Sequence, residues 1–163
     1  AAALRTIPVD ELARLIYPSG YFNSKARKVR AFVHYLGEHY NDSLEAMFQV
    51  DTESLRRELL SVYGIGEETA DSILLYAGGK PVFVVDAYTR RIMHRLGMAP
   101  ERDTYVAYQS LFHDNLPRDV ALFNEYHALF VRHGKERCHR RDPVTTGCPL
   151  QDICLYARQA AGL

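Results

Sequence analysis

The sequence predicts an all-α fold, and three observations lead to this prediction. Apolar residues recur at intervals of three and four positions through most of the chain, and no alternating strand pattern of useful length occurs. Capping residues and glycines separate the periodic segments. Hydrophobic residues make up 47% of the 163 residues, which is enough for a sizeable core. We therefore expect about eight or nine helices, with no internal repeat and no low-complexity segment.

The segment that precedes residue 50 is predicted to form helices separated by turns. A short helix is expected from Pro8 to Ile16, and Gly20 helps to stop it. Ser24 is the expected N-cap of a longer helix, because its hydroxyl can accept a hydrogen bond from the first turn. The buried stripe predicted for that helix comprises Ala26, Val29, Phe32, Val33 and Leu36. A turn at 41–43 leads to a further short helix at 44–48.

Residues 59–77 are predicted to form two helices joined by a turn that contains two glycines. Gly64 and Gly66 permit positive φ where the chain must turn sharply. Glu67 and Glu68 open the second helix, where acidic side chains suit the positive end of the helix dipole. Backbone N–H groups at such a helix start can hold a phosphate oxygen. The alternative is an ordinary helical hairpin in which the glycines only make the turn.

An extended apolar link follows the hairpin and leads to further helices. The link runs from Pro81 to Val85 and ends at Asp86, which begins a helix that carries Arg90 and Arg91. The remaining helices are predicted to start at Asp51 or Thr52, at Asp103 or Thr104, at Arg118 (to His133, closed by Gly134) and at Pro149 (to Ala160).

This order of features resembles the helix-hairpin-helix DNA glycosylase superfamily, to which endonuclease III belongs. The signature of that family is a two-glycine hairpin, a link with proline and glycine, and an aspartate at the start of the next helix. Residues 21–26 are similar to the family's helix start ahead of the hairpin, and residues 126–135 to the helix before its iron–sulfur loop. The resemblance thus covers nearly the whole chain.

The resemblance implies a fold of two lobes. A helical barrel lobe over residues 1–115 would contain the hairpin and a catalytic aspartate. A C-terminal helical lobe over residues 116–163 would contain a cysteine loop at 138–154. Family members usually carry several further helices before the point that corresponds to Ala1. The barrel lobe is therefore expected to be incomplete at its N-terminus.

Asp86 is the residue to which the resemblance assigns catalysis. Cleavage of an N-glycosidic bond goes through an oxocarbenium-like sugar, which a nearby carboxylate stabilises while it orients or deprotonates a nucleophile. The alternative is a plain N-cap, worth about 1 kcal/mol. The hairpin immediately upstream favours the catalytic role.

The hairpin also predicts the type of reaction in base-excision DNA repair. Bifunctional family members place a lysine two residues after the second glycine, where it forms a Schiff base with the sugar. This chain has Glu68 there, which cannot form an imine, and so we expect a monofunctional DNA glycosylase without efficient AP-lyase activity. The hairpin residues 64–71 and the segment 84–88 are most similar to the subgroup that resembles bacterial 3-methyladenine DNA glycosylases. This similarity implies alkylated purines as substrates.

Two other functions remain open. The first is an endonuclease III-type enzyme that removes oxidised pyrimidines and has AP-lyase activity, against which Glu68 argues. The second is a non-catalytic helix-hairpin-helix module that only binds DNA. Asp86 argues against this second function, and the expected N-terminal incompleteness argues for it.

Double-stranded DNA with a damaged base flipped into a pocket beside Asp86 is the expected partner. Lys+Arg and Asp+Glu both number 20, so a DNA-binding chain must gather its basic residues on one face. The candidate DNA contacts are Tyr63, Gly64, Ile65, Gly66, Glu68, Thr69 and Arg90. The candidate basic residues are Lys25, Arg27, Lys28, Arg30, Arg90, Arg91, Arg95, Arg132, Lys135, Arg137, Arg140 and Arg141. Tyr21, Phe22 and Tyr63 are candidate pocket aromatics, with core packing as the alternative.

The last 26 residues contain all three cysteines. The family pattern for a [4Fe–4S] cluster is Cys-x6-Cys-x2-Cys-x5-Cys, which Cys138, Cys148 and Cys154 match at three of four positions. Thr145 stands at the second position, and threonine is a poor iron ligand. A cluster with another ligand on the fourth iron, a loop without a cluster, three free thiols, and zinc held with His139 all remain open. His127 and His133 are interpreted as surface or helix-packing histidines.

The sequence contains no apolar run of membrane-spanning length and no visible signal peptide. Three cysteines near one end do not resemble a secreted disulfide framework. We therefore expect an intracellular monomer, cytoplasmic and associated with the nucleoid if the source is bacterial.

Overall fold

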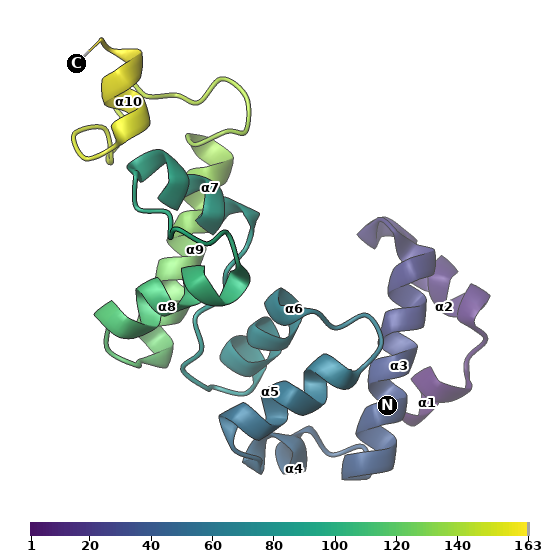
Figure 1. The fold of residues 1–163 in the computed structure, drawn as a ribbon. Coiled ribbons are helices and arrows are strands. Elements are labelled where there is room, and N and C mark those ends of the chain that lie inside the picture. The colour runs from purple at the N-terminus through teal and green to yellow at the C-terminus, as the bar shows by residue number, and fades with distance from the viewer. Residues whose placement is uncertain (163) are drawn as a thin grey trace. The chain divides into compact units, whose positions relative to one another are not determined.

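In a computed structural model, which describes residues 1–162, every regular element is a helix or a helical turn, and no strand occurs among those residues (Figure 1). The all-α prediction is therefore confirmed. The chain forms two compact units, Ala1–Ala70 and Asp71–Leu163. The lobe boundary predicted between residues 115 and 116 falls inside the second unit.

The first unit is built around its longest helix, α3. Its elements are α1 (Ala2–Thr6), α2 (Val9–Leu15), the 3-10 turn η1 (Tyr17–Ser19), α3 (Phe22–Tyr40), α4 (Leu44–Gln49), α5 (Thr52–Ser61) and the start of α6 (Glu67–Ser72). Helices α1, α2 and α4 all pack against α3. Leu12 and Ala13 of α2 are buried against Ala26 of α3, and Phe22 packs at the edge of this cluster.

Helix α3 starts earlier than the sequence predicts. The prediction of Ser24 as N-cap is wrong, because Tyr21 occupies that position and its carbonyl accepts the first helical hydrogen bond, from the amide of Lys25. Gly20 at φ 65° and Tyr21 at φ 46° reverse the chain here. The helix therefore begins at Phe22, and Tyr17 lies against the ring of Phe22 at a centroid distance of 4.8 Å.

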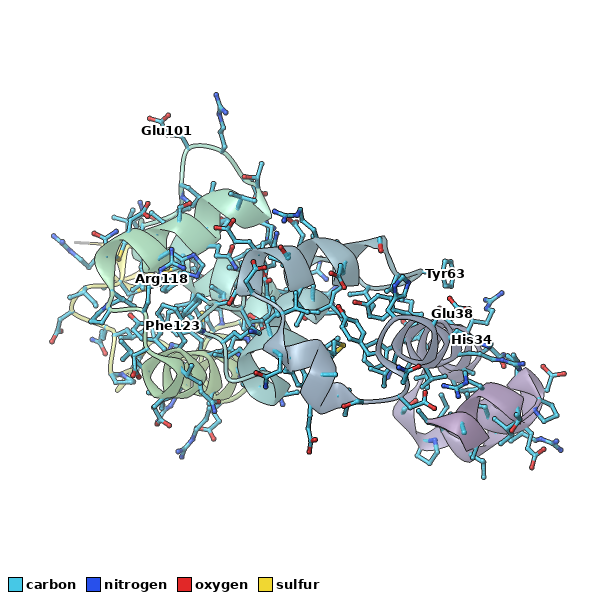
Figure 2. All side chains as sticks on the ribbon, turned by 90° about the horizontal axis from the view of Figure 1, so that it is seen from below. His34, Glu38, Tyr63, Glu101, Arg118 and Phe123 are labelled. Carbon is cyan, nitrogen blue, oxygen red and sulfur yellow. The ribbon has the colours of Figure 1, made fainter. Side chains whose placement is uncertain are left out.

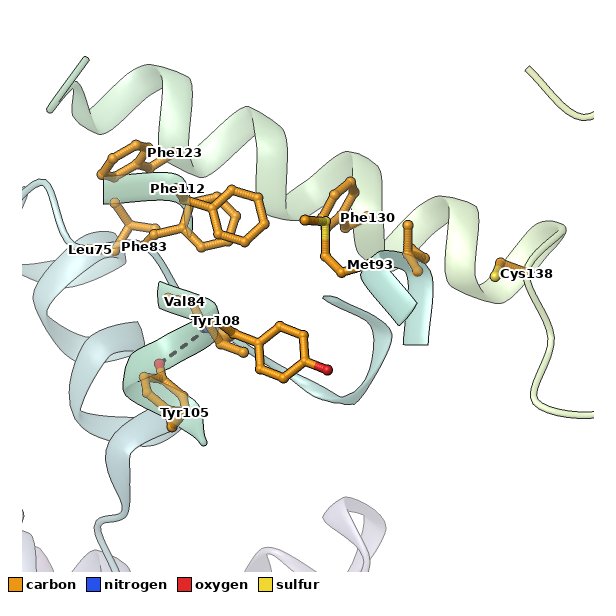
Figure 3. Packing of buried hydrophobic residues seen from close by; sticks show 12 residues of the cluster. Leu75, Phe83, Val84, Met93, Tyr105, Tyr108, Phe112, Phe123, Phe130 and Cys138 are labelled. Atoms are coloured by element: carbon orange, nitrogen blue, oxygen red, sulfur yellow. Dashed lines mark hydrogen bonds between the residues drawn. The ribbon is translucent and has the colours of Figure 1, made fainter. Parts of the chain in front are cut away.

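The second unit has an aromatic core (Figure 3). Its elements are the end of α6, the π-helical turn η2 (Ile73–Ala77), α7 (Ala87–Leu96), α8 (Tyr105–Asn115), α9 (Val120–Glu136) and α10 (Leu155–Ala160). Phe83 stacks on Phe112 with ring centroids 3.7 Å apart and makes an edge contact with Phe123 at 5.4 Å. All three side chains are buried.

The apolar link that precedes α7 lies outside the helices, as predicted. Its residues 82–85 are buried, and side chains of α8 bind its backbone. The amide of Phe83 donates to Nε2 of His113 at 2.9 Å. The amide of Val85 donates to the Tyr105 hydroxyl at 3.2 Å (Figure 3). Gln109 donates to the Phe83 carbonyl at 2.7 Å. These contacts replace the strand partner that a buried extended segment otherwise needs. They hold the end of the link in place at Asp86.

Two helix boundaries near the C-terminus differ from the prediction. Helix α9 does not stop at Gly134 but continues to Glu136. Gly134 is buried there, and a Cβ atom on it would lie 2.2 Å from the ring of Tyr88, so this glycine permits close packing rather than ending the helix. The last helix begins at Leu155 instead of Pro149, after a series of turns.

Candidate active site

The two hairpin glycines have different conformations. Gly64 has a φ of 84°, in the left-handed region, and a Cβ atom on it would lie 2.3 Å from Cγ of Lys28. Gly66 does not adopt positive φ, and a Cβ atom there would meet nothing within 4 Å. The expectation that both glycines supply positive φ is therefore wrong for Gly66. The carbonyl of Gly66 instead accepts from the amide of Ala70 at 2.9 Å and so begins α6.

Some of the other hairpin residues are buried in the protein, and the rest are exposed to solvent. Val62 and Ile65 are buried, and the amide of Ile65 donates to the Val62 carbonyl at 3.1 Å. Tyr63 is 62% exposed and projects outward (Figure 2). Glu68 and Thr69 are also exposed. Of the three candidate pocket aromatics, Tyr21 is exposed as well, whereas Phe22 is partly buried against the cluster of Leu12, Ala13 and Ala26.

Asp86 is the N-cap of α7, and its two carboxylate oxygens have different partners. Oδ1 accepts from the backbone amide of Thr89 at 2.7 Å and from the Thr89 hydroxyl at 2.9 Å. Oδ2 lies 3.5 Å from Nε2 of His127. Burial of the carboxyl raises its pKa, but the contacts with His127 and Thr89 outweigh burial and leave the pKa of Asp86 below its usual range. The group is therefore ionised at neutral pH.

His127 comes from the middle of α9 and connects Asp86 to a tyrosine. Its ring is buried, and its Nδ1 atom is hydrogen-bonded to the hydroxyl of Tyr76, which lies at the end of η2. Burial, followed by the nearby charge of Asp86, raises the pKa of Tyr76. The sequence assigns His127 only to a surface or a helix-packing position. It does not reveal the contact with Asp86, because no local spacing relates the two segments.

Arg90, a predicted DNA contact, interacts with two side chains of the protein itself. Its Nη1 atom donates to Oδ1 of Asp103 at 2.7 Å, and its guanidinium lies 5.0 Å from the centre of the Tyr108 ring. The predicted hairpin contacts belong to the first unit, whereas Arg90 belongs to the second, with Asp86.

Two further arginines of α7 bind the cysteine loop. Arg91 donates from Nε to the Cys138 carbonyl at 2.8 Å and from Nη2 to the Gly134 carbonyl at 3.2 Å. Arg95 donates to Sγ of Cys138 at 3.1 Å. These contacts place the loop against the same helix that Asp86 caps. Arg91 and Arg95 thus help to fix the fold of the second unit.

The three cysteines line one cavity. Cys138, Cys148 and Cys154 surround it together with Thr145, and its volume is about 30 Å³. No disulfide joins the cysteines. Within residues 1–162, no three His, Cys, Asp or Glu side chains are placed to hold one metal ion. The thiols are grouped, but they do not converge on a single point.

The chain matches known proteins along most of its length. The family model described as "HhH-GPD superfamily base excision DNA repair protein" matches residues 1–118. A protein of Methanocaldococcus jannaschii named "Putative DNA repair glycosylase MJ1434" is 44% identical over 147 residues, which cover 90% of this chain and 66% of the relative. Endonuclease III of Sulfolobus acidocaldarius is 30% identical over 148 residues, covering 91% of this chain and 63% of that protein. The chain thus spans slightly less than two thirds of these curated relatives.

Solved structures show the same fold. A non-covalent complex of endonuclease III with DNA superimposes with a TM-score of 0.80 over 98% of this chain and 70% of that chain, at 24% identity. The 3-methyladenine DNA glycosylase of H. pylori, bound to 1,N6-ethenoadenine, superimposes with a TM-score of 0.67 over 82% of this chain and 66% of that chain, at 28% identity.

None of the helices within residues 1–162 is long and apolar enough to cross a membrane.

The hairpin of residues 59–77, the buried link and the helix start at Asp86 therefore occur together, in the order that the sequence indicates. The family model covers all of them. The chain belongs to the HhH-GPD superfamily of base excision DNA repair proteins.

Proposed function

We propose that this protein is a monofunctional DNA glycosylase that hydrolyses the N-glycosidic bond of alkylated purine bases. The geometry of Asp86 carries this proposal. Its Oδ1 atom is occupied by Thr89, whereas Oδ2 has only the longer contact with His127. One ionised oxygen is therefore held in a fixed direction and keeps lone pairs for a substrate.

The proposed role of Asp86 is to stabilise positive charge on the sugar. As the bond to the base breaks, the sugar becomes oxocarbenium-like, and a carboxylate beside it lowers the free energy of that state. The lowered pKa of Asp86 makes it a weak base, so we expect it to orient a water molecule rather than to remove its proton early. The hairpin would bind a backbone phosphate while the damaged nucleotide is flipped out of the duplex.

Glu68 supports a reaction that leaves the DNA strand intact. The Schiff-base intermediate that leads to strand cleavage requires an amine, and a carboxylate cannot form one. The H. pylori relative supports the substrate class, since it is a 3-methyladenine glycosylase that is 28% identical to this chain. Alkylated purines are cationic and leave readily, which suits a site whose main contribution is one carboxylate.

Duplex oligonucleotides that contain 3-methyladenine, thymine glycol or an abasic site test this proposal. We expect strand cleavage of the 3-methyladenine duplex only after treatment with alkali, and no enzymatic cleavage of the abasic duplex when alkali is omitted. Direct nicking of the thymine glycol and abasic duplexes would instead assign an endonuclease III-type activity. Binding to all three duplexes without base release would assign a non-catalytic DNA-binding module.

We further propose that the cysteine loop holds a [4Fe–4S] cluster through Cys138, Cys148 and Cys154. The donor types fit, because each cysteine of a cluster binds a different iron and the thiols need not converge on one point. Such a cluster would fix the fold of the loop, with no part in the chemistry at Asp86.

Two features of the loop limit the fit. Thr145 leaves one iron without a protein thiolate. The cavity of about 30 Å³ has room for little more than a water molecule, so the loop must open to admit a cluster. Iron and sulfide analysis of the purified protein tests this proposal. About four irons per chain, lost in Cys148→Ser, would support the cluster, whereas zinc or no metal would contradict it.

A further inference from the structure

His127 connects two oxygen atoms in the second unit. Its Nδ1 atom is hydrogen-bonded to the hydroxyl of Tyr76, and its Nε2 atom faces Oδ2 of Asp86 at 3.5 Å. Nε2 is fully buried and has no hydrogen bond of normal geometry. A buried ring nitrogen without a hydrogen bond costs free energy. The position of this nitrogen opposite a carboxylate therefore calls for an explanation.

The neighbours of the ring determine which nitrogen carries the proton. With a proton on Nδ1 alone, the lone pair of Nε2 would face the negative Oδ2 atom of Asp86, which is repulsive. With the proton on Nε2, the imidazole donates to Asp86, and Nδ1 is free to accept from the Tyr76 hydroxyl. The geometry therefore favours the Nε2–H tautomer of the neutral ring, in which both contacts are satisfied.

We propose that His127 is a positioning residue for Asp86, and that the hydroxyl of Tyr76 fixes the tautomer in which His127 donates to the carboxylate. The inference rests on the proposed glycosylase function, because the orientation of Asp86 affects a reaction only if Asp86 is the catalytic carboxylate. A neutral imidazole can hold Oδ2 without cancelling its negative charge. A lysine or arginine at that place would neutralise the charge that the oxocarbenium-like sugar requires.

The three residues come from the three elements that meet at this point. Tyr76 is on η2, His127 is on α9, and Asp86 caps α7; both η2 and α7 pack against α9. The nearest cations of α7 are directed elsewhere, Arg90 to Asp103 and Arg91 to backbone carbonyls. Among the described residues of the second unit, the titratable groups linked to Asp86 are thus His127, which faces its Oδ2 atom, and Tyr76, which senses its charge. Tyr76 is 48% exposed, so the series of contacts ends at solvent.

Two substitutions of His127 separate positioning from packing. His127→Gln keeps an N–H donor at the same number of bonds from the backbone, whereas His127→Leu fills a similar volume without a donor. Base release from the 3-methyladenine duplex is measured under single-turnover conditions across a range of pH. We expect His127→Leu to be slower by about tenfold at neutral pH, and His127→Gln to recover most of that loss.

The acid limb of the pH profile provides the readout that packing alone would not change. Asp86 must be ionised to act, and the His127 contact helps to lower its pKa. Without the donor that pKa rises, and the acid limb of His127→Leu should move to higher pH. An equal loss of rate in both variants, with the acid limb unmoved, would overturn the proposal and leave His127 a packing residue.

A second measurement does not depend on activity. Nitrogen-15 NMR of the imidazole in the free protein distinguishes the two neutral tautomers. We expect the Nε2–H form in the wild type and a mixture of tautomers in Tyr76→Phe. A wild-type spectrum of the Nδ1–H form would overturn the proposal. If the wild type releases no base at all, the proposed function fails, and this spectrum still decides whether His127 donates to Asp86.

Discussion

Thr89 donates two hydrogen bonds to a single oxygen of Asp86, one from its backbone amide at 2.7 Å and one from its hydroxyl at 2.9 Å. Capping and catalysis are therefore compatible roles for Asp86, although the sequence presents them as alternatives. The cap uses Oδ1 and leaves Oδ2 to face His127. Capping also fixes the side-chain rotamer, which places the second oxygen.

Substitution of Asp86 by asparagine separates these two roles. An asparagine retains an oxygen that accepts from Thr89, so we expect α7 to stay capped and the thermal unfolding midpoint to change little. The negative charge is lost, and single-turnover base release should fall by at least about a hundredfold. DNA affinity, measured by gel shift, should stay close to that of the wild type.

Asp119→Asn is the matched control for this substitution. Asp119 caps α9 through the amide of Leu122 at 2.7 Å and is exposed to solvent. We expect this variant to release bases at the wild-type rate. Near-normal turnover by Asp86→Asn would show that Asp86 has no catalytic role.

The hairpin glycines give opposite predictions for stability and DNA binding. Gly64→Ala forces a side chain into positive φ and toward Lys28, and it should lower the free energy of unfolding by about 1 kcal/mol. Gly66→Ala meets no protein atom and needs no strained φ, so stability should be unchanged. A methyl group there would nevertheless obstruct the backbone phosphate that we propose the hairpin binds, and so the affinity for duplex DNA should fall.

Urea unfolding and fluorescence anisotropy with a labelled duplex measure these two effects separately. Full DNA affinity in Gly66→Ala would show that the Gly66 backbone does not contact the phosphate. The hairpin would then be an ordinary turn between α5 and α6.

Glu68 predicts that borohydride traps no adduct between the wild-type protein and DNA. Glu68→Lys places an amine at the position of the lysine in bifunctional family members, and we expect a trapped adduct with an abasic duplex. Glu67→Lys is the control, because it places the same amine one position earlier, at the first residue of α6. In the wild type, the Oε1 atom of Glu67 lies 3.8 Å from Nη2 of Arg56. Trapping by the wild type would contradict monofunctional chemistry, and equal trapping by both lysine variants would show that the amine position does not matter.

Local patterns predict the elements of this fold that local interactions determine. Asp86 caps a helix as its sequence context indicates, and Asp51 and Thr104 each do so as one of the two residues that the sequence offers. A capping hydrogen bond joins residues three positions apart, so that its signal is contained in a short segment.

The contacts that define the candidate site join distant residues and leave no such signal. Tyr76 and His127 are 51 positions apart. Gly134 follows a periodic apolar segment, which predicts a helix stop, whereas Tyr88 on another helix explains the glycine. Arg90 pairs with Asp103, which lies 13 positions away on a different segment. Tertiary packing decides such positions, and one sequence does not reveal it.

Glu58 connects α5 to α3 and provides a prediction of pH dependence. Its Oε2 atom accepts from the hydroxyl of Tyr35 at 2.7 Å and from the hydroxyl of Tyr40. Hydrogen bonds from Tyr40 and then Tyr35 lower the pKa of Glu58 below its usual value, outweighing its partial burial. A carboxyl with a lower pKa in the folded state stabilises the fold when ionised. Its contribution is complete above the unfolded pKa and is lost as the pH falls through the folded pKa.

Glu58→Gln should therefore lower the free energy of unfolding by about 1 kcal/mol at pH 7, since neutral hydrogen bonds replace charge-assisted ones. The difference between variant and wild type should shrink below about pH 4, where the wild-type carboxyl also becomes protonated. Urea unfolding at pH 7 and at lower pH measures this difference, and Glu125→Gln, at an exposed position of α9, controls for the lost charge. A difference that stays constant down to the lowest accessible pH would mean that the tyrosines bind the side chain without favouring its ionised form.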